Sequence, residues 1–93
     1  MRVERIRQKL QSELHPIRLE IEDESHKHEG HHPKGGGGHF RVFIVSPAFS
    51  GKPLLARHRM VYEALSEQMR DEIHALAIKA RAPEEVSDSG NPA

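Results

Sequence analysis

The feature that most constrains this chain is the stretch from Asp23 to Phe40, which holds five of its eight histidines and five of its seven glycines. Glycine loses more conformational freedom on folding than any other residue. A segment of about fifteen residues without regular structure is uncommon inside a compact domain and is either functional or disordered. The packed part of the fold must therefore form from the residues on either side.

Apolar residues recur at steps of three and four near the N-terminus, which predicts an amphipathic helix that ends before Pro16. The stripe consists of Val3, Ile6, Leu10 and Leu14. The next stretch, IRLEIED from Ile17, alternates apolar and charged residues. A period of two is typical of a half-buried strand with one wet face.

Beyond the glycines, HFRVFIVS from His39 is rich in aromatic and β-branched residues and predicts a second, more buried strand. PAFSGKP then predicts a turn or a short irregular helix. A second helix is expected from Leu54 to about Met69, with Pro53 at its start. Its predicted apolar side consists of Leu54, Leu55, His58, Val61, Tyr62, Leu65 and Met69.

IHALAIKA predicts a third strand, whose alternation places His74 on one face with Leu76 and Ile78. A short helix can start at Pro83, and the polar residues 87–93 are expected to form a disordered tail. The order helix, strand, strand, helix, strand predicts a single α+β domain over residues 1–86, with residues 24–38 as its flexible loop. We expect a three-stranded mixed sheet covered on one face by two helices.

The predicted connections say where His74 lies. The first two strands can pair antiparallel, whereas a crossover through the second helix makes the second and third strands parallel. Parallel strands begin at the same edge of a sheet. His74 is therefore expected at the edge where the glycine-rich loop ends. This position supports a metal ligand, although a lone histidine on a strand is more often a core or edge residue satisfied by the backbone.

Composition excludes several classes of protein. The chain has no cysteine, so it offers neither disulfides nor thiolate ligands. Lys plus Arg equals Asp plus Glu at 14 each, so no net positive field drives binding to nucleic acid or membranes. No apolar run approaches the ~20 residues of a membrane span, and we expect a cytoplasmic protein. SGK lacks the first glycine and the Ser or Thr of a phosphate-binding loop, and no catalytic set is recognisable.

Several motifs resemble the BolA family, from the first helix to about Val86. These are RIRQKL, LEIEDESHKH, HFRVFIVSPAFSG, ARHRMVY and IHALAIKARAPEE. The resemblance implies a class II KH-like fold. It also implies a heterodimer with a monothiol glutaredoxin around a shared [2Fe-2S] cluster, with thiolates from glutaredoxin and glutathione. An association with transcriptional and morphological control is implied as well.

By this resemblance, His74 matches the family's C-terminal cluster ligand. His28, three residues beyond DES, falls where one branch of the family supplies its second ligand from the loop. His31 and His32 are rivals, and His39 is a further candidate as ligand, neighbouring partner or capping group. Imidazoles also suit Zn and Ni, so a histidine-rich Zn or Ni site remains an alternative.

Lys52, Arg57 and Arg59 gather near the start of the second helix, where the helix dipole favours anions. They are candidate contacts for nucleic acid or a partner, and the competing interpretation is a solvated helix start.

The prediction from the sequence is a non-enzymatic accessory factor in iron–sulfur cluster assembly, trafficking or iron and redox sensing. The alternative is a DNA-binding regulator of stress response and cell morphology.

Overall fold

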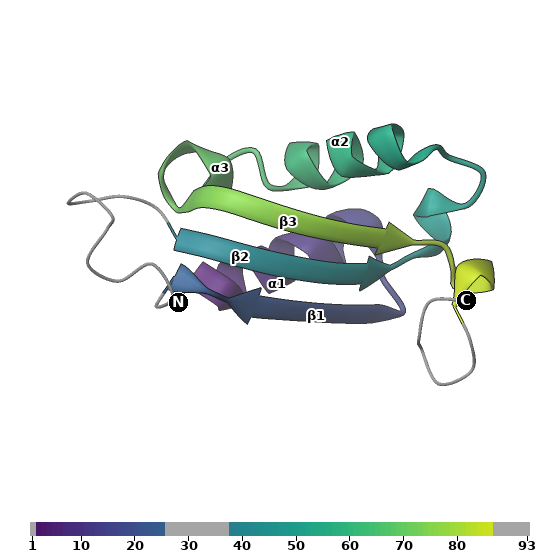
Figure 1. Ribbon diagram of the computed structural model, residues 1–93, viewed down its shortest axis with the longest axis horizontal. Helices are drawn as coiled ribbons and strands as arrows, with labels where there is room; N and C mark the ends of the chain where they lie inside the picture. Colours follow the sequence, from purple (N-terminus) through teal and green to yellow (C-terminus); the bar gives the residue numbers. More distant parts are fainter. Residues whose placement is uncertain (1, 26–37, 87–93) are drawn as a thin grey trace.

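The computed structural model describes residues 2–25 and 38–86 (Figure 1). In chain order the elements are α1 (Arg2–Leu14), β1 (Arg18–Asp23), β2 (Gly38–Val45), η2 (Pro47–Phe49), α2 (Leu54–Ala64), α3 (Gln68–Asp71), β3 (Ile73–Arg81) and η3 (Pro83–Glu85). The predicted α+β class is confirmed, and the order is compatible with the KH-like fold that the resemblance implies. Most of the predicted loop and the whole predicted tail lie outside the described residues.

The three strands form one sheet in the order β1-β2-β3. β1 pairs antiparallel with β2, from Arg18 opposite Val45 to Asp23 opposite Phe40. β2 pairs parallel with β3, so both begin at the same end of the sheet (Figure 1). Both predicted pairings are confirmed.

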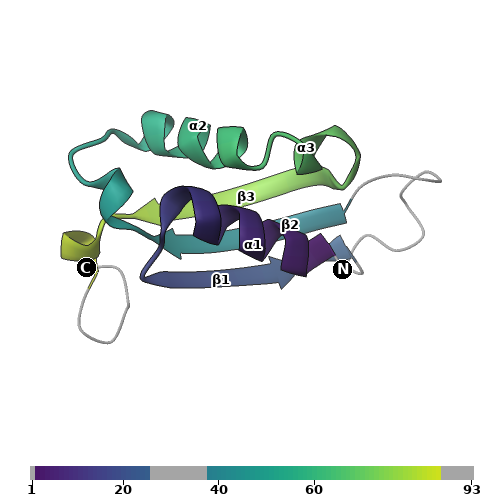
Figure 2. The same cartoon turned by 180° about the vertical axis from the view of Figure 1, so that it is seen from behind.

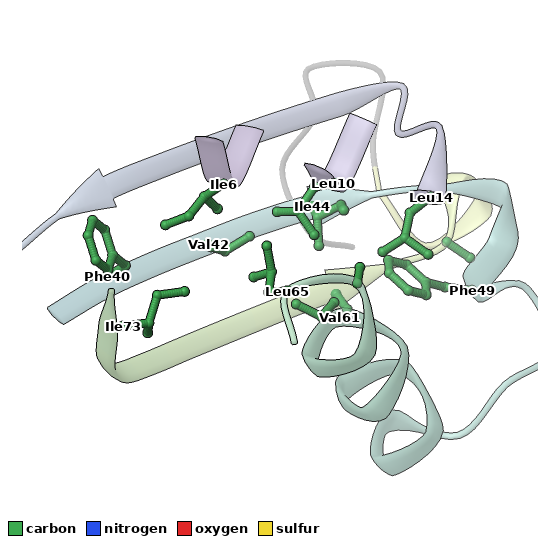
Figure 3. Close-up of a cluster of buried hydrophobic side chains, with 13 residues drawn as sticks. Ile6, Leu10, Leu14, Phe40, Val42, Ile44, Phe49, Val61, Leu65 and Ile73 are labelled. Carbon is green, nitrogen blue, oxygen red and sulfur yellow. The ribbon is translucent and has the colours of Figure 1, made fainter. Parts of the chain in front are cut away.

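The helices lie on one side of the sheet, α1 across β1 and β2 and α2 along the β3 side (Figure 2). Between helices and sheet lies one apolar core, drawn in Figure 3. Its largest fully buried side chains include Phe40, Phe49, Ile6, Leu10, Ile44 and Leu65. The opposite face of the sheet carries no helix among the described residues (Figure 1).

The predicted second helix is too long, and its predicted inward face is only partly confirmed: Val61 and Leu65 are buried and Met69 packs against the core, whereas Leu54, Leu55 and Tyr62 are exposed. α2 ends at Ala64, and α3 begins separately at Gln68. Leu54 and Leu55 are 55% and 65% exposed, whereas Arg57 is 5% exposed. Hydropathy alone places an arginine on the solvent-exposed side of a helix. An arginine can be buried only where hydrogen-bond acceptors are buried beside it.

Glu85 belongs to the acceptor set that makes the burial of Arg57 tolerable. The Arg57 guanidinium donates from Nη1 and Nη2 to the two carboxylate oxygens of Glu85, at 2.6 and 2.9 Å. It also donates to the carbonyl oxygens of Ala80 and Lys52. The Ala82 N–H donates to the same carboxylate. This network joins the start of α2 to the end of β3 and to η3.

The Arg57 guanidinium lowers the pKa of Glu85 from its ordinary value of 4.5 to about 2, with the Ala82 N–H acting in the same direction. An unfolded chain binds this proton near the ordinary value. The contribution of the ion pair to stability is therefore fully present above about pH 4.5 and is lost as the pH falls towards 2.

We expect Glu85→Gln to lower the free energy of unfolding at neutral pH, because the amide cannot pair with the buried guanidinium through two charged oxygens. The difference in the free energy of unfolding between wild type and variant should shrink as the pH falls from 4.5 to about 2. Urea denaturation at a series of pH values measures it. Glu84→Gln is the matched control, since the Glu84 carboxylate is exposed and accepts from Ser50. If this difference in unfolding free energy stayed constant down to pH 2, the Arg57–Glu85 ion pair would not be its cause.

Candidate functional site

A β-bulge sets the position of His74 at the start of β3. Gly38 of β2 lies opposite Ile73, but the next residue, His39, lies opposite Ala75. His74 is thus an extra residue in β3, which resets the alternation of side chains. Ile73 points to the core, whereas His74 and Ala75 are both exposed.

The prediction that His74 shares a face with Leu76 and Ile78 is therefore wrong. Those two side chains pack against the core. His74 follows the core-facing Ile73 and lies on the side of the sheet that carries no helix, as His39 does, and the bulge puts Leu76 and Ile78 on the core side instead. Strict alternation along a sequence cannot foresee a bulge.

His39 and His74 lie side by side, with ring centroids 5.2 Å apart and ring planes at 44°. Two imidazoles bound to one tetrahedral metal ion through bonds of about 2.0–2.1 Å have ring centres roughly 5 Å apart. The observed spacing fits two ligands of one metal ion. No group of three or more His, Cys, Asp or Glu side chains with metal-binding geometry occurs in residues 2–25 and 38–86. Further ligands must come from residues 26–37 or from another molecule.

Both ends of the histidine-rich segment are held beside this pair. The Ser25 Oγ accepts from the His39 N–H at 3.0 Å. The Glu24 N–H donates to the His39 carbonyl at 2.7 Å, and the Gly38 N–H donates to the Glu72 carbonyl at 3.0 Å. These contacts hold Glu24 and Ser25 against the start of β2 and hold Gly38 against the residue that precedes β3.

The predicted ligands His28, His31 and His32 lie outside the described residues. Their distance from the stem is nevertheless bounded by chain length, since a residue spans at most about 3.6 Å. His28 follows Ser25 by three residues, so its Cα lies within roughly 11 Å of the Ser25 Cα. Each of the three remains a candidate.

Helix α1 fixes the turn that precedes His74. Arg5 Nε forms an ion pair with Glu72 Oε1 at 3.0 Å, and Arg2 donates to the Glu72 carbonyl. The Arg2 guanidinium also lies over the Phe40 ring, 5.8 Å from its centroid. Sequence reasoning missed Ser25, Gly38 and Glu72 as supports of the site, because each acts through a backbone contact distant in sequence.

The predicted cationic group at the start of α2 needs a correction. Lys52 and Arg59 are exposed, as a contact for nucleic acid or a partner requires. Arg57 is buried, and its donors are committed to Glu85 and to backbone carbonyls. Arg57 is therefore a structural residue, and two of the three predicted cations remain.

Comparison with known proteins shows the family. The BolA-like protein family model matches residues 10–85. The chain belongs to the BolA-like family. It is 47% identical over 88 residues to SufE-like protein 1 of Arabidopsis thaliana, covering 88% of this chain and 24% of that protein. It is 44% identical over 75 residues to the DNA-binding transcriptional regulator BolA of Escherichia coli, covering 81% of this chain and 70% of that one.

The chloroplastic protein BOLA1 of Arabidopsis is 46% identical over 88 residues, which cover 90% of this chain and 55% of that protein. The chain thus spans a quarter to about half the length of these two plant relatives. No helix in the described part of the chain is long and apolar enough to cross a bilayer. Because both plant relatives are named for organelles, the cytoplasmic location stays a prediction.

Solved BolA structures share the fold. BolA1 from Arabidopsis superposes with a TM-score of 0.81 at 42% identity, covering 94% of this chain and 98% of that one. The BolA domain of SufE1 from the same plant gives 0.79 at 47% identity, with coverage of 89% and 93%. Yeast Fra2 gives 0.60 at 26% identity, with coverage of 91% and 85%.

Gly38 has no room for a side chain. A Cβ there would lie 2.6 Å from Ser25 Oγ and 2.7 Å from the Phe40 ring. We expect Gly38→Ala to lower the free energy of unfolding by about 1–3 kcal/mol, because both neighbours must move. Thermal denaturation measures this. Gly51→Ala is the comparison, since its Cβ meets nothing within 4 Å and only the φ of +75° opposes it. A Gly38 variant as stable as wild type would show that the stem is not tightly packed.

Proposed function

We propose that this protein is a non-enzymatic accessory factor in iron–sulfur cluster assembly, trafficking or sensing, and that it shares a [2Fe-2S] cluster with a monothiol glutaredoxin. The observation that carries the proposal is the His39–His74 pair, whose ring centroids are 5.2 Å apart at the stem of the histidine-rich segment. Membership of the BolA-like family supports it.

The donor set of the chain fits this cargo. Neutral imidazoles bind iron, and two histidines on one iron raise the reduction potential of a [2Fe-2S] centre relative to ligation by cysteine alone. Because the chain has no cysteine, the other iron needs thiolates from a partner. A monothiol glutaredoxin with glutathione supplies these.

His74 is proposed as the first ligand and one further imidazole as the second. His28 is the ligand that the family resemblance favours, whereas the described geometry favours His39. His39 is held by backbone hydrogen bonds on both sides, so little conformational entropy is lost when it binds.

We expect His74→Ala to abolish formation of the shared cluster, because the exposed side chain on the bulge has no histidine substitute on β3. Ultraviolet-visible absorption and circular dichroism, after mixing the apo protein with cluster-loaded glutaredoxin, measure the loss. His15→Asn is the control, since His15 is exposed and its φ of 46° suits asparagine. An unchanged cluster spectrum in His74→Ala would remove the proposal.

The second ligand is decided by comparing His39→Ala with His28→Ala in the same mixture. Loss of a histidine ligand should remove the two-histidine signature, whereas loss of a bystander should leave it. If His39 binds the cluster, His39→Ala gives the larger change and His28→Ala leaves the spectrum near wild type. The reverse result assigns the ligand to the loop and leaves His39 as a neighbour.

Acidification should weaken the heterocomplex, because an imidazole binds metal only when it is deprotonated. We expect the cluster signal to fall as the pH is lowered through the range in which histidines titrate. Apo glutaredoxin mixed with this protein serves as the control for acid dissociation of the two chains. A cluster signal that is independent of pH would argue against histidine ligation.

Two other functions remain as alternatives. One is a DNA-binding regulator of stress response and cell morphology, and the name of the Escherichia coli relative, a DNA-binding transcriptional regulator, supports the DNA-binding part. The burial of Arg57 weakens the version of this idea that uses the start of α2. A Zn or Ni site built from loop histidines is the other alternative. Titration of the isolated protein with Zn²⁺ or Ni²⁺ distinguishes it, since only this function needs no partner.

A further inference from the structure

Three of the four large apolar side chains that are exposed in the described part of the chain belong to α2. They are Leu54, Leu55 and Tyr62, which are 55%, 65% and 40% exposed. The buried side of the helix includes Val61 and Ala64 and faces the core. None of the described elements covers the opposite, outward side of α2 (Figures 1 and 2). Exposed apolar side chains gathered in one place indicate an interaction surface.

Helical spacing places two of these apolar residues on one line along the outward side of α2. Leu55 and Tyr62 are seven residues apart, with Arg59 between them and Glu63 directly after Tyr62. Arg59 and Glu63 are both exposed, and at 3.6 residues per turn both lie on the same side of the line from Leu55 to Tyr62. We call these four residues the outer stripe. It combines two apolar side chains with one charge of each sign.

The two charges of the outer stripe have no ionic partner within the fold. Arg59 and Glu63 are one helical turn apart, yet neither forms an ion pair in residues 2–25 and 38–86. A cation that precedes its acid by four residues is the weaker order for such a pair. α2 also has no acidic residue in its first turn and no basic residue in its last turn, which is the reverse of what the helix dipole favours. Both charges are therefore available to a group outside this chain.

We propose that the outer stripe binds a second copy of this chain. The two α2 helices pack antiparallel about a two-fold axis that is level with Val61. Each Arg59 then lies level with Glu63 of the other copy, since both are two residues from the axis. The two Tyr62 rings meet near the axis, and a Leu55 lies at each end of the contact.

Two-fold symmetry brings the charged flanks of the two outer stripes together. The axis keeps the same side of each helix in register, so the flank that carries Arg59 and Glu63 in one copy adjoins the same flank in the other. Packed helices have axes about 8–10 Å apart, a separation that an arginine and a glutamate side chain can bridge. Antiparallel packing also places the negative end of each α2 dipole beside the positive end of the other.

A second copy fits the outer stripe better than other occupants. An acidic peptide or an anionic membrane surface would attract Arg59 but repel Glu63, and a basic partner would do the reverse. An antiparallel copy presents each charge to its opposite. A two-fold interface requires a surface that is complementary to itself, and the outer stripe meets this condition.

The contact involves one helix of 11 residues from each copy, so the dimer should be weak, with a Kd of about 10⁻⁴ M. Sedimentation equilibrium of the metal-free protein from about 10 μM to about 1 mM measures it. We expect mostly monomer at the lower concentration and mostly dimer at the higher one. Over the same range, amide resonances of α2 should shift in ¹⁵N–¹H correlation spectra, whereas those of β1 should not.

Reversing one charge of the pair should break the dimer, and mixing the two reversals should restore it. Arg59→Glu and Glu63→Arg should each weaken self-association about 10-fold or more, because each puts like charges opposite one another. An equal mixture of the two variants should associate within about 3-fold of wild type, because every pair across the axis then has opposite signs. Tyr62→Ser should weaken the dimer about 5-fold by removing the central ring contact. Circular dichroism checks that each variant folds.

A mixture of Lys79→Glu with Glu13→Arg is the matched control, since it makes the same changes in net charge at exposed positions outside α2. Each of these variants should associate as wild type does and gain nothing on mixing. An equal gain in this control mixture would overturn the proposal, as would an undiminished dimer in Arg59→Glu. A protein that stays monomeric at about 1 mM would also overturn it. None of these measurements uses a cluster or glutaredoxin, so their outcome is independent of the proposed cluster function.

Discussion

Parallel pairing of β2 with β3 requires the two strands to begin at the same end of the sheet. His39 and His74 are far apart in sequence, with two helices between them, yet this pairing brings their backbones to neighbouring positions. Because Ile73 faces the core, the alternation at the start of β3 turns His74 to the face that His39 occupies. The bulge then returns Leu76 and Ile78 to the core side. The proposed cluster function depends on this geometry.

The sequence predicts those features of the fold that depend on hydrophobic periodicity and on the connections between elements. Alternation and helical spacing give the element order, and the right-handed crossover gives the parallel pair and the end of the sheet at which His74 lies. The bulge at His74 escapes prediction because its cause is tertiary. Gly38 must meet both Ser25 and the Phe40 ring at close range, and the Gly38 N–H is bonded to Glu72. None of these contacts leaves a pattern in local sequence.

Arg57 escapes prediction for a related reason. A charged residue on a helix is placed outward by any hydropathy pattern, and the inward position becomes favourable only when acceptors from β3 and η3 are known. Leu54 and Leu55 are exposed in the first turn of α2, whereas Val61 in its second half is buried. The family resemblance supplies His74 and His28 as candidate ligands. The predicted parallel pairing places His39 and His74 at the same edge of the sheet, but neither pattern nor resemblance gives the 5.2 Å between their rings.

The anchoring of β3 explains how a small domain keeps one face of its sheet open. β3 is an edge strand, and only Ile73 and Ala80 of its apolar residues are fully buried. Leu76 and Ile78 pack against the core from the same face, and the parallel pairing with β2 supplies backbone hydrogen bonds along the strand. Charged groups add contacts at both ends: Arg2 and Arg5 of α1 contact Glu72 before the strand, and Arg57 pairs with Glu85 after it. Because these contacts lie at the ends and on the helical side, the exposed middle of β3 needs no apolar cover. Ala75, Ala77 and Lys79 are exposed, and the histidine pair lies at the end of the sheet where β2 and β3 begin.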